Sequence, residues 1–183
     1  MRGRFCLALL LTLATSTATA SSRQETYDHI LDSVVARYHL PGIAVGVIDH
    51  GKVVYTATRG ETVAGSGQRI DARTLFKIAS NSKAMTTALL GRLVDRGKLR
   101  WDDPVTKYLP DFAMHDPWVT KNMRVADLLT HSSGLPEGGG DLMLWPEPNA
   151  YTRQDIIHGL RDIAPGYSFR SKYQYDNLLY VVA

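Results

Sequence analysis

Apolar residues near the start of the chain recur first with the period of an α-helix and then in two strand-like runs. Pro41-Gly42 ends a helical stripe that consists of Tyr27, Ile30, Leu31, Val34, Val35 and Tyr38. The two runs, rich in β-branched residues, lie at 43–48 and 53–58, and the turn Asp49-His50-Gly51-Lys52 separates them. This order predicts one helix followed by a β-hairpin.

A second helical pattern begins near Ser80, directly after a short extended apolar run at 74–78. Gly97 is positioned to end this helix as its C′ residue. The apolar face of the predicted helix consists of Met85, Leu89, Leu90, Leu93 and Val94. Strands that precede helices, without regular alternation, favour an α+β fold with an antiparallel sheet.

The rest of the chain predicts loops and short helices. Residues 125–130 resemble the end of a helix that stops at Ser132-Ser133-Gly134, where Gly134 fits a helix C-terminus. A variant capping box at Thr152-Arg153-Gln154-Asp155 opens another helix that continues through Leu160. A last apolar helix is predicted to begin at Asn177.

The first 20 residues have the features of a secretory signal. Arg2 and Arg4 form a basic segment, residues 5–13 form an apolar segment too short to span a bilayer, and Ala18-Thr19-Ala20 is an A-x-A cleavage site. We therefore predict a signal peptide at 1–20, a single domain at 21–183, and a secreted or periplasmic protein. Cys6, the only cysteine, precedes the position of a lipoprotein cysteine, so no lipid anchor, disulfide or Cys-ligated metal is expected.

Composition excludes several classes of function. Arg2 and Arg4 account for two of the 21 basic residues, so 19 basic residues face 18 acidic ones beyond the signal. That balance gives no argument for nucleic acid or an anionic membrane as a partner. Hydrophobic and charged fractions of 44% and 21% are those of an ordinary globular protein. The six histidines show no H-x-H or H-x-x-x-H spacing, so we expect no metal and no other cofactor.

Ser80 and Lys83 are the first candidates for chemistry, in an S-x-x-K arrangement at the predicted start of a helix. The unpaired N–H groups and positive dipole at a helix N-terminus favour an alkoxide and an oxyanion. Lys83 would lie on the same helical face, within reach of the Ser80 hydroxyl. A lysine in a low-dielectric pocket can lose its proton and act as a base. The structural alternative is a serine N-cap followed by an exposed lysine.

Tyr175-Asp176-Asn177 is the only Y-x-N in the chain, and it precedes the last predicted helix. In an extended turn Tyr175 and Asn177 would point to the same side. Tyrosine can relay a proton, and asparagine can bind a substrate amide and a lysine at the same time. The structural alternative is a core tyrosine followed by an asparagine N-cap.

Other candidate motifs carry less weight. His131 lies beside Ser132 and Ser133, but adjacent residues rarely face each other, and we favour a structural role for it. No G-x-S-x-G is present, which disfavours an α/β-hydrolase. Glycines 138–140 lack the Lys-Ser/Thr of a phosphate-binding loop.

In order and separation, these motifs resemble the serine β-lactamases and penicillin-binding proteins, in the class C-like branch that includes exported esterases and D-aminopeptidases. The resemblance covers nearly all of residues 21–183. The matching segments are Thr74-Leu75-Phe76, Ser80-Asn81-Ser82-Lys83, Asp103-Pro104-Val105, Tyr108-Leu109-Pro110, residues 128–136, Pro165-Gly166 and Tyr175-Asp176-Asn177.

This resemblance implies a fold and a set of roles. The fold would be an antiparallel sheet flanked by helices, with an all-helical insertion after the nucleophile helix. Ser80 would be acylated, Lys83 would be the base and Tyr175 the second proton-transfer group. Asn177 would contact Lys83 and the substrate, a small molecule or peptide, and the Ser80 N–H would donate to the oxyanion.

The chain departs from the family pattern in two places. No K-T-G or H-x-G follows Tyr175, so we expect a fragment that lacks the C-terminal part of the fold. One hypothesis is an exported serine hydrolase acting through an acyl-enzyme on an amide, ester or β-lactam; the alternative is a non-catalytic fragment or ligand-binding remnant. Asp176 stands where β-lactamases often have Ser or Ala. A carboxylate facing Lys83 would favour its protonated form, which disfavours a true β-lactamase.

Overall fold

The computed structural model describes residues 6–183, so Arg2 and Arg4 of the predicted signal lie outside the described residues. The chain divides into two compact units, one ending at Lys77 and the other running from Ile78 to Ala183. Within residues 6–183, no helix is both long enough and apolar enough to cross a membrane.

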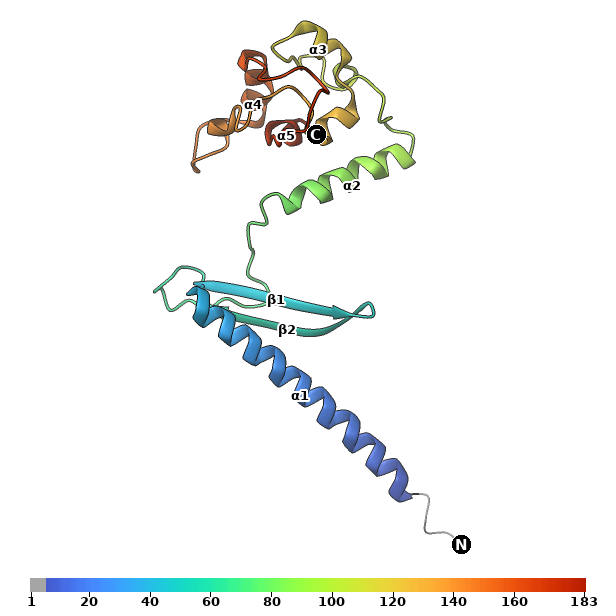
Figure 1. Cartoon of the computed structure of the whole chain (residues 1–183), viewed down its shortest axis with the longest axis vertical. Coiled ribbons are helices and arrows are strands. Elements are labelled where there is room, and N and C mark those ends of the chain that lie inside the picture. Colours follow the sequence, from blue (N-terminus) through green and yellow to red (C-terminus); the bar gives the residue numbers. More distant parts are fainter. Residues whose placement is uncertain (1–5) are drawn as a thin grey trace. The chain divides into compact units, whose positions relative to one another are not determined.

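The first unit contains a long helix and the predicted hairpin. Helix α1 spans Cys6–Tyr38, and strands β1 (Gly42–Asp49) and β2 (Lys52–Gly60) pair antiparallel (Figure 1). The Tyr55 hydroxyl of β2 donates a 2.8 Å hydrogen bond to Asp28 of α1, and Arg59 donates to Asp28 and Asp32. These bonds hold α1 against β2. The antiparallel pairing of β1 and β2 confirms the predicted hairpin.

Two predictions for this region need correction. Leu31 is buried, but Ile30 and Tyr38 of the predicted stripe are exposed, because only one narrow side of α1 packs on the hairpin. Residues 74–78 form no strand: they are irregular, and Leu75 is 96% exposed. An apolar run adopts strand structure only where another strand is available to pair with it.

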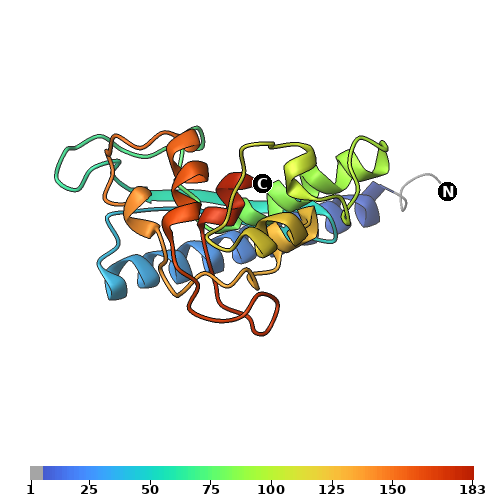
Figure 2. The same cartoon turned by 90° about the horizontal axis from the view of Figure 1, so that it is seen from above.

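The second unit consists of short helices around a shared core. Its α-helices are α2 (Asn81–Asp95), α3 (Pro117–Asn122), α4 (Arg153–Gly159) and α5 (Leu178–Val182). Its 3₁₀ turns are η1 (Val105–Lys107), η2 (Val125–Leu129), η3 (Asp141–Met143) and η4 (Leu160–Asp162). Helices α4 and α5 lie side by side in both views (Figures 1 and 2).

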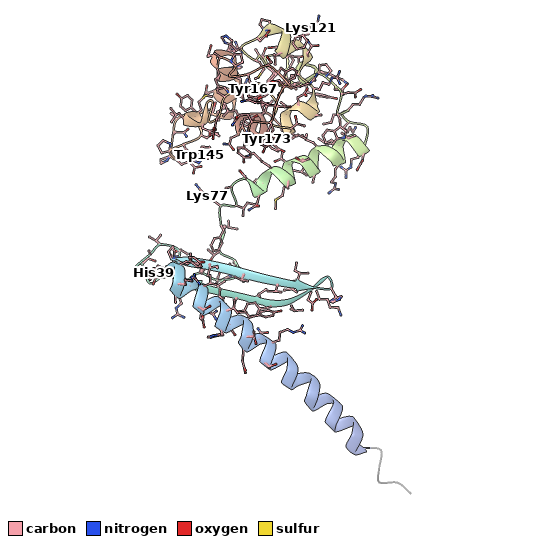
Figure 3. All side chains as sticks on the ribbon, viewed as in Figure 1. His39, Lys77, Lys121, Trp145, Tyr167 and Tyr173 are labelled. Carbon is pink, nitrogen blue, oxygen red and sulfur yellow. The ribbon has the colours of Figure 1, made fainter. Side chains whose placement is uncertain are left out.

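Side chains from all of these elements except α2 and η3 supply the fully buried core (Figure 3). The largest completely buried side chains are Phe112, Met123, Leu135, Leu160, Leu178, Leu179 and Val105. Because two of them come from α5, the core fixes the segment that carries the Tyr175-Asp176-Asn177 motif.

Two local predictions around His131 and Thr152 had different outcomes. The segment before His131 is the 3₁₀ turn η2, and His131 itself takes the left-handed conformation after it, at φ 55°. The prediction that Gly134 ends a helix is therefore wrong. The capping box at Thr152 is confirmed, with reciprocal bonds between Thr152 and Asp155, although α-helical geometry ends at Gly159.

Helix α2 forms where predicted: its last residue is Asp95, Arg96 is the C-cap, and Gly97 follows at φ 64°. Its inward side matches the predicted face only at Leu90 and Val94, which are half-buried. Lys83, Thr87 and Leu90 are half-buried, whereas Met85, Leu89 and Leu93 are exposed. The orientation of α2 is thus the one that directs Lys83 toward the start of α5.

Candidate active site

Ser80 lies at the N-cap position of α2, where the sequence analysis expected a nucleophile. Ala79, the residue before it, has φ 43°, a conformation that alanine adopts only at a cost of about 1–3 kcal/mol. The N–H groups of Asn81 and Ser82 are used by Ile78 and Ala79 carbonyls. Among the described hydrogen bonds none uses the Ser80 N–H as donor, so this group can bind an oxyanion.

Lys83 connects Ser80 to the Y-x-N motif. Its Nζ atom donates to Ser80 Oγ at 3.1 Å and to Asn177 Oδ1 at 2.8 Å. The same ammonium lies over the rings of Tyr175 and Tyr180, 4.7 Å and 5.3 Å from their centroids. The alternative of an exposed surface lysine is therefore wrong, because Lys83 has polar and aromatic partners on several sides.

Tyr175 completes the group. Its hydroxyl hydrogen-bonds Ser80 Oγ, although the two residues are 95 positions apart in sequence. Burial alone would raise the pKa of Tyr175, but hydrogen bonds with Lys83 and Ser80 and the charge of Lys83 outweigh it, so the pKa is lowered. A tyrosine with a lowered pKa next to a serine hydroxyl is suited to proton transfer.

Asp176 caps the start of α5, and Asn177 contacts Lys83; the sequence predicts both roles for Asn177 as alternatives. Asn177 occupies the N-cap position of α5 but makes no capping bond with its side chain. Asp176 accepts from the Leu179 N–H instead, at 3.3 Å, and from the Ser133 hydroxyl at 3.2 Å. Asn177 thus stands at the N-cap, as the structural alternative expects, but its side chain does not cap the helix and its amide is available to Lys83.

Asp176 is 3% exposed, and its carboxylate bonds the start of α5 and Ser133 rather than Lys83. Burial raises the pKa of this carboxyl against the opposing hydrogen bond from Leu179. Asp176 thus faces the interior, as the argument against a β-lactamase requires, and the charge of Lys83 acts on its carboxyl although the two side chains make no hydrogen bond.

His131 supports Tyr175 from behind. Its Nδ1 accepts a 3.2 Å hydrogen bond from the Asp176 N–H, and its ring stacks on Tyr175 with centroids 4.5 Å apart. No hydrogen bond joins His131 to a serine among the described residues, which agrees with the structural role expected for it. Tyr173, labelled in Figure 3, packs edge-on against the same imidazole at 5.4 Å.

Two residues at this site, Tyr180 and Asp141, belong to neither motif that the sequence indicated. Tyr180 stacks near His131 and donates to the Leu129 carbonyl at 3.2 Å, and Asp141 accepts two hydrogen bonds from the Asn177 amide. No spacing in the sequence pairs Asp141 with Asn177, 36 positions away. Only the fold brings the glycine-rich loop at 138–140 beside α5.

A family described as Beta-lactamase matches residues 27–183. The chain is 31% identical over 169 residues to Unguisins hydrolase ungD' of Aspergillus campestris, covering 87% of this chain and 30% of that protein. It is 32% identical over 146 residues to Esterase EstB of Burkholderia gladioli, covering 77% of this chain and 35% of that protein. The chain thus spans about a third of the length of these curated relatives.

Solved structures resemble the chain over a larger share of their length. The octameric penicillin-binding protein homologue of Pyrococcus abyssi superposes with a TM-score of 0.69 at 26% identity, covering 88% of this chain and 37% of that one. A class C β-lactamase gives a TM-score of 0.67 at 25% identity, covering 90% and 44%. The predicted β-lactamase/transpeptidase-like fold, represented here in part, is confirmed.

Proposed function

Because this chain belongs to the Beta-lactamase family, we propose that it carries the nucleophile and proton-transfer groups of a serine hydrolase acting through an acyl-enzyme. The substrate is an amide, an ester or a β-lactam. One observation carries the proposal: Lys83 Nζ contacts Ser80 Oγ at 3.1 Å and Asn177 Oδ1 at 2.8 Å, while the Tyr175 hydroxyl bonds the same Ser80 oxygen.

Acylation begins when Ser80 Oγ attacks the substrate carbonyl carbon. Lys83, as the base, accepts the hydroxyl proton across the contact between its Nζ and Ser80 Oγ. The Ser80 N–H stabilises the negative oxygen of the tetrahedral intermediate. When the intermediate collapses, the bond to the leaving group breaks, and Tyr175 delivers a proton to the leaving nitrogen or oxygen.

Deacylation repeats the sequence with water as the nucleophile. Tyr175, left as tyrosinate, takes a proton from the water that attacks the acyl carbon. The ester bond to Ser80 then breaks, and the proton held by Lys83 returns to Ser80 Oγ. The lowered pKa of Tyr175 makes its ionised form easier to reach than that of an ordinary tyrosine.

The relatives support an acyl-transfer substrate without selecting one. An esterase and a class C β-lactamase are both similar to this chain. Both reactions pass through a tetrahedral intermediate on a serine, which is the species that the Ser80 cluster is arranged to stabilise.

The test is covalent labelling of Ser80 in the full-length protein that contains this sequence. A fluorescent fluorophosphonate and a fluorescent penicillin are each incubated with the wild type, Ser80→Ala and Ser82→Ala. We expect the wild type and Ser82→Ala to be labelled and Ser80→Ala to be unlabelled, with the adduct mapped to Ser80 by peptide mass. Equal labelling of the wild type and Ser80→Ala would overturn the assignment of Ser80, and no labelling of either protein would favour a non-catalytic binding protein.

We further propose that the protein is exported through a signal at residues 1–20. The basic and apolar segments and the A-x-A site support it. Expression of the full-length protein with a C-terminal tag should yield a mature N-terminus at Ser21. Recovery of the intact N-terminus from the cytoplasmic fraction alone would contradict export.

A further inference from the structure

The Asn177 side chain is held between two groups of opposite charge. Its Oδ1 accepts from Lys83 Nζ at 2.8 Å, and its Nδ2 donates to both carboxylate oxygens of Asp141, each at 3.2 Å. Within residues 78–183, no other side chain hydrogen-bonds or pairs with the Asp141 carboxylate. Within these residues, the Asp141 carboxylate is therefore linked to the catalytic cluster only through the Asn177 amide.

We propose that Asp141 is a positioning residue: it fixes the orientation of the Asn177 amide, and through it the position of Lys83 toward Ser80. The inference rests on the proposed function, since it concerns the lysine that deprotonates Ser80. It assigns a role to a residue outside the S-x-x-K and Y-x-N motifs.

Donor and acceptor chemistry selects this orientation. A carboxylate can only accept hydrogen bonds, so the NH₂ end of Asn177 must face Asp141. The carbonyl end then faces Lys83, which donates. If the amide turned over, its NH₂ would meet the Lys83 amine and its oxygen would meet the carboxylate, and both contacts would repel. Without Asp141, only Lys83 would select between the two orientations.

The backbone is built to bring Asp141 to this place. Gly140, at φ 81°, precedes η3, and a Cβ added to it would lie 2.2 Å from Leu178 Cδ1 and 2.8 Å from Ile163 Cδ1. The loop thus packs against the residue that follows Asn177, more closely than any side chain on residue 140 allows. The Asp141 N–H donates to the Gly138 carbonyl at 3.0 Å, which completes the turn.

A double-mutant cycle on the full-length protein tests the proposal. Asp141→Leu keeps the size of the side chain but removes the acceptor, and we expect kcat/KM to fall roughly tenfold, mainly in kcat, as for a lost hydrogen bond to a charged group. The kcat/KM of Asn177→Ala should fall further than that of Asp141→Leu. Because Asp141 acts only through Asn177, the double variant should match Asn177→Ala within about twofold.

The same cycle separates positioning from a general structural role. If the two losses multiply in the double variant, Asp141 does not act through Asn177 and the proposal fails. Asp162→Leu, an exposed acidic residue changed in the same way, should keep wild-type kinetics. Failure of Ser80 labelling would overturn the proposed function instead, and the two failures are thereby distinguishable.

Asp141→Asn provides a variant that retains an acceptor if Asp141→Leu does not fold. Its side-chain oxygen can still accept from Asn177, so kcat should stay within about threefold of the wild type. The Asp141 charge opposes the lowering of the Tyr175 pKa, so its removal should move the alkaline limb of the kcat profile to lower pH. A loss equal to that of Asp141→Leu would contradict the proposal.

Discussion

At the scale of single residues, Lys83 controls the acidity of Tyr175. Burial raises the pKa of this tyrosine, and the hydrogen bond and charge of Lys83, together with the hydrogen bond of Ser80, more than compensate. We predict that Tyr175 ionises below the usual tyrosine pKa of about 10. Replacing Lys83 with Met leaves only the Ser80 hydrogen bond to oppose burial, so the pKa of Tyr175 should rise relative to the wild type.

Tyrosinate absorbance near 295 nm, titrated against pH, measures this change. The signal of Tyr175 is obtained as the difference between each protein and its Tyr175→Phe counterpart. Lys172→Met, which removes a cation 4.8 Å from the Tyr167 ring, is a matched control that should leave the Tyr175 titration unchanged. An unchanged titration in Lys83→Met would contradict the electrostatic account.

Asp176 is a second residue whose titration affects the protein, in this case its stability. Burial raises its pKa from 3.8, so the folded state binds the proton more tightly than the unfolded state does. The resulting stabilisation is complete below the unfolded pKa and is lost as the pH rises through the raised folded pKa. Asn at position 176 does not titrate and can still accept from the Leu179 N–H.

We therefore predict that the melting temperature of Asp176→Asn, relative to the wild type, increases between about pH 4 and pH 7. Thermal unfolding followed by circular dichroism at several pH values measures it. The exposed carboxylate variant Asp162→Asn should show a nearly constant difference over the same range. A relative stability of Asp176→Asn that falls as the pH rises would reverse the sign and contradict the burial argument.

At the scale of elements, the glycine-rich loop before η3 connects backbone conformation to the site. Gly138 and Gly140 have φ of 65° and 81°, but an added Cβ meets nothing within 4 Å at Gly138 and meets Leu178 and Ile163 at Gly140. Alanine at either position should cost about 1–2 kcal/mol in conformational strain. Only Gly140→Ala should also displace the loop and lower activity, by roughly tenfold or more.

Urea denaturation and kcat/KM of the two alanine variants, measured side by side, check this prediction. Equal activity losses in Gly138→Ala and Gly140→Ala would indicate that strain alone matters. An unchanged activity in Gly140→Ala would show that the position of Asp141 has little influence on the reaction.

Elements whose signals are local could be predicted from the sequence. The hairpin follows from two β-branched runs and a turn, and the start of α4 follows from the Thr152–Asp155 capping box. Residues 74–78 carry the same apolar signal as a strand, yet strand structure requires a partner, and pairing is not encoded in the run itself. The left-handed His131 is equally hidden, since histidine gives no conformational signal of the kind that glycine gives.

The sequence predicts the two motifs of the candidate site but not how the fold brings them together. Ser80 and Lys83 are three positions apart on one helix, and Tyr175 and Asn177 lie in one turn, so each pair was visible. Their meeting depends on the packing of α5 against α4 and η2, which is a property of the core. The same dependence explains why the inward side of α2 follows the predicted apolar face only in part. It is set by Lys83 and its partners rather than by the most apolar stripe.

At the scale of the whole molecule, the core of the second unit sets stability, while the Ser80 cluster lies at its edge. Phe112 is 2% exposed and belongs to the hydrophobic core, which includes none of the four site residues Ser80, Lys83, Tyr175 and Asn177. Phe112→Ala should therefore lower the free energy of unfolding by about 3–5 kcal/mol, through lost burial and the cavity left behind. Because that is a large share of a typical 5–15 kcal/mol, the urea midpoint should fall markedly. Well below the melting temperature, the folded fraction should still be labelled at Ser80.

Leu142→Ala, at a position 83% exposed, should change stability by no more than about 0.5 kcal/mol. If Phe112→Ala unfolds at the wild-type midpoint, the core does not depend on this ring; if it stays folded but loses labelling, the core and the site are coupled more tightly than their geometry indicates.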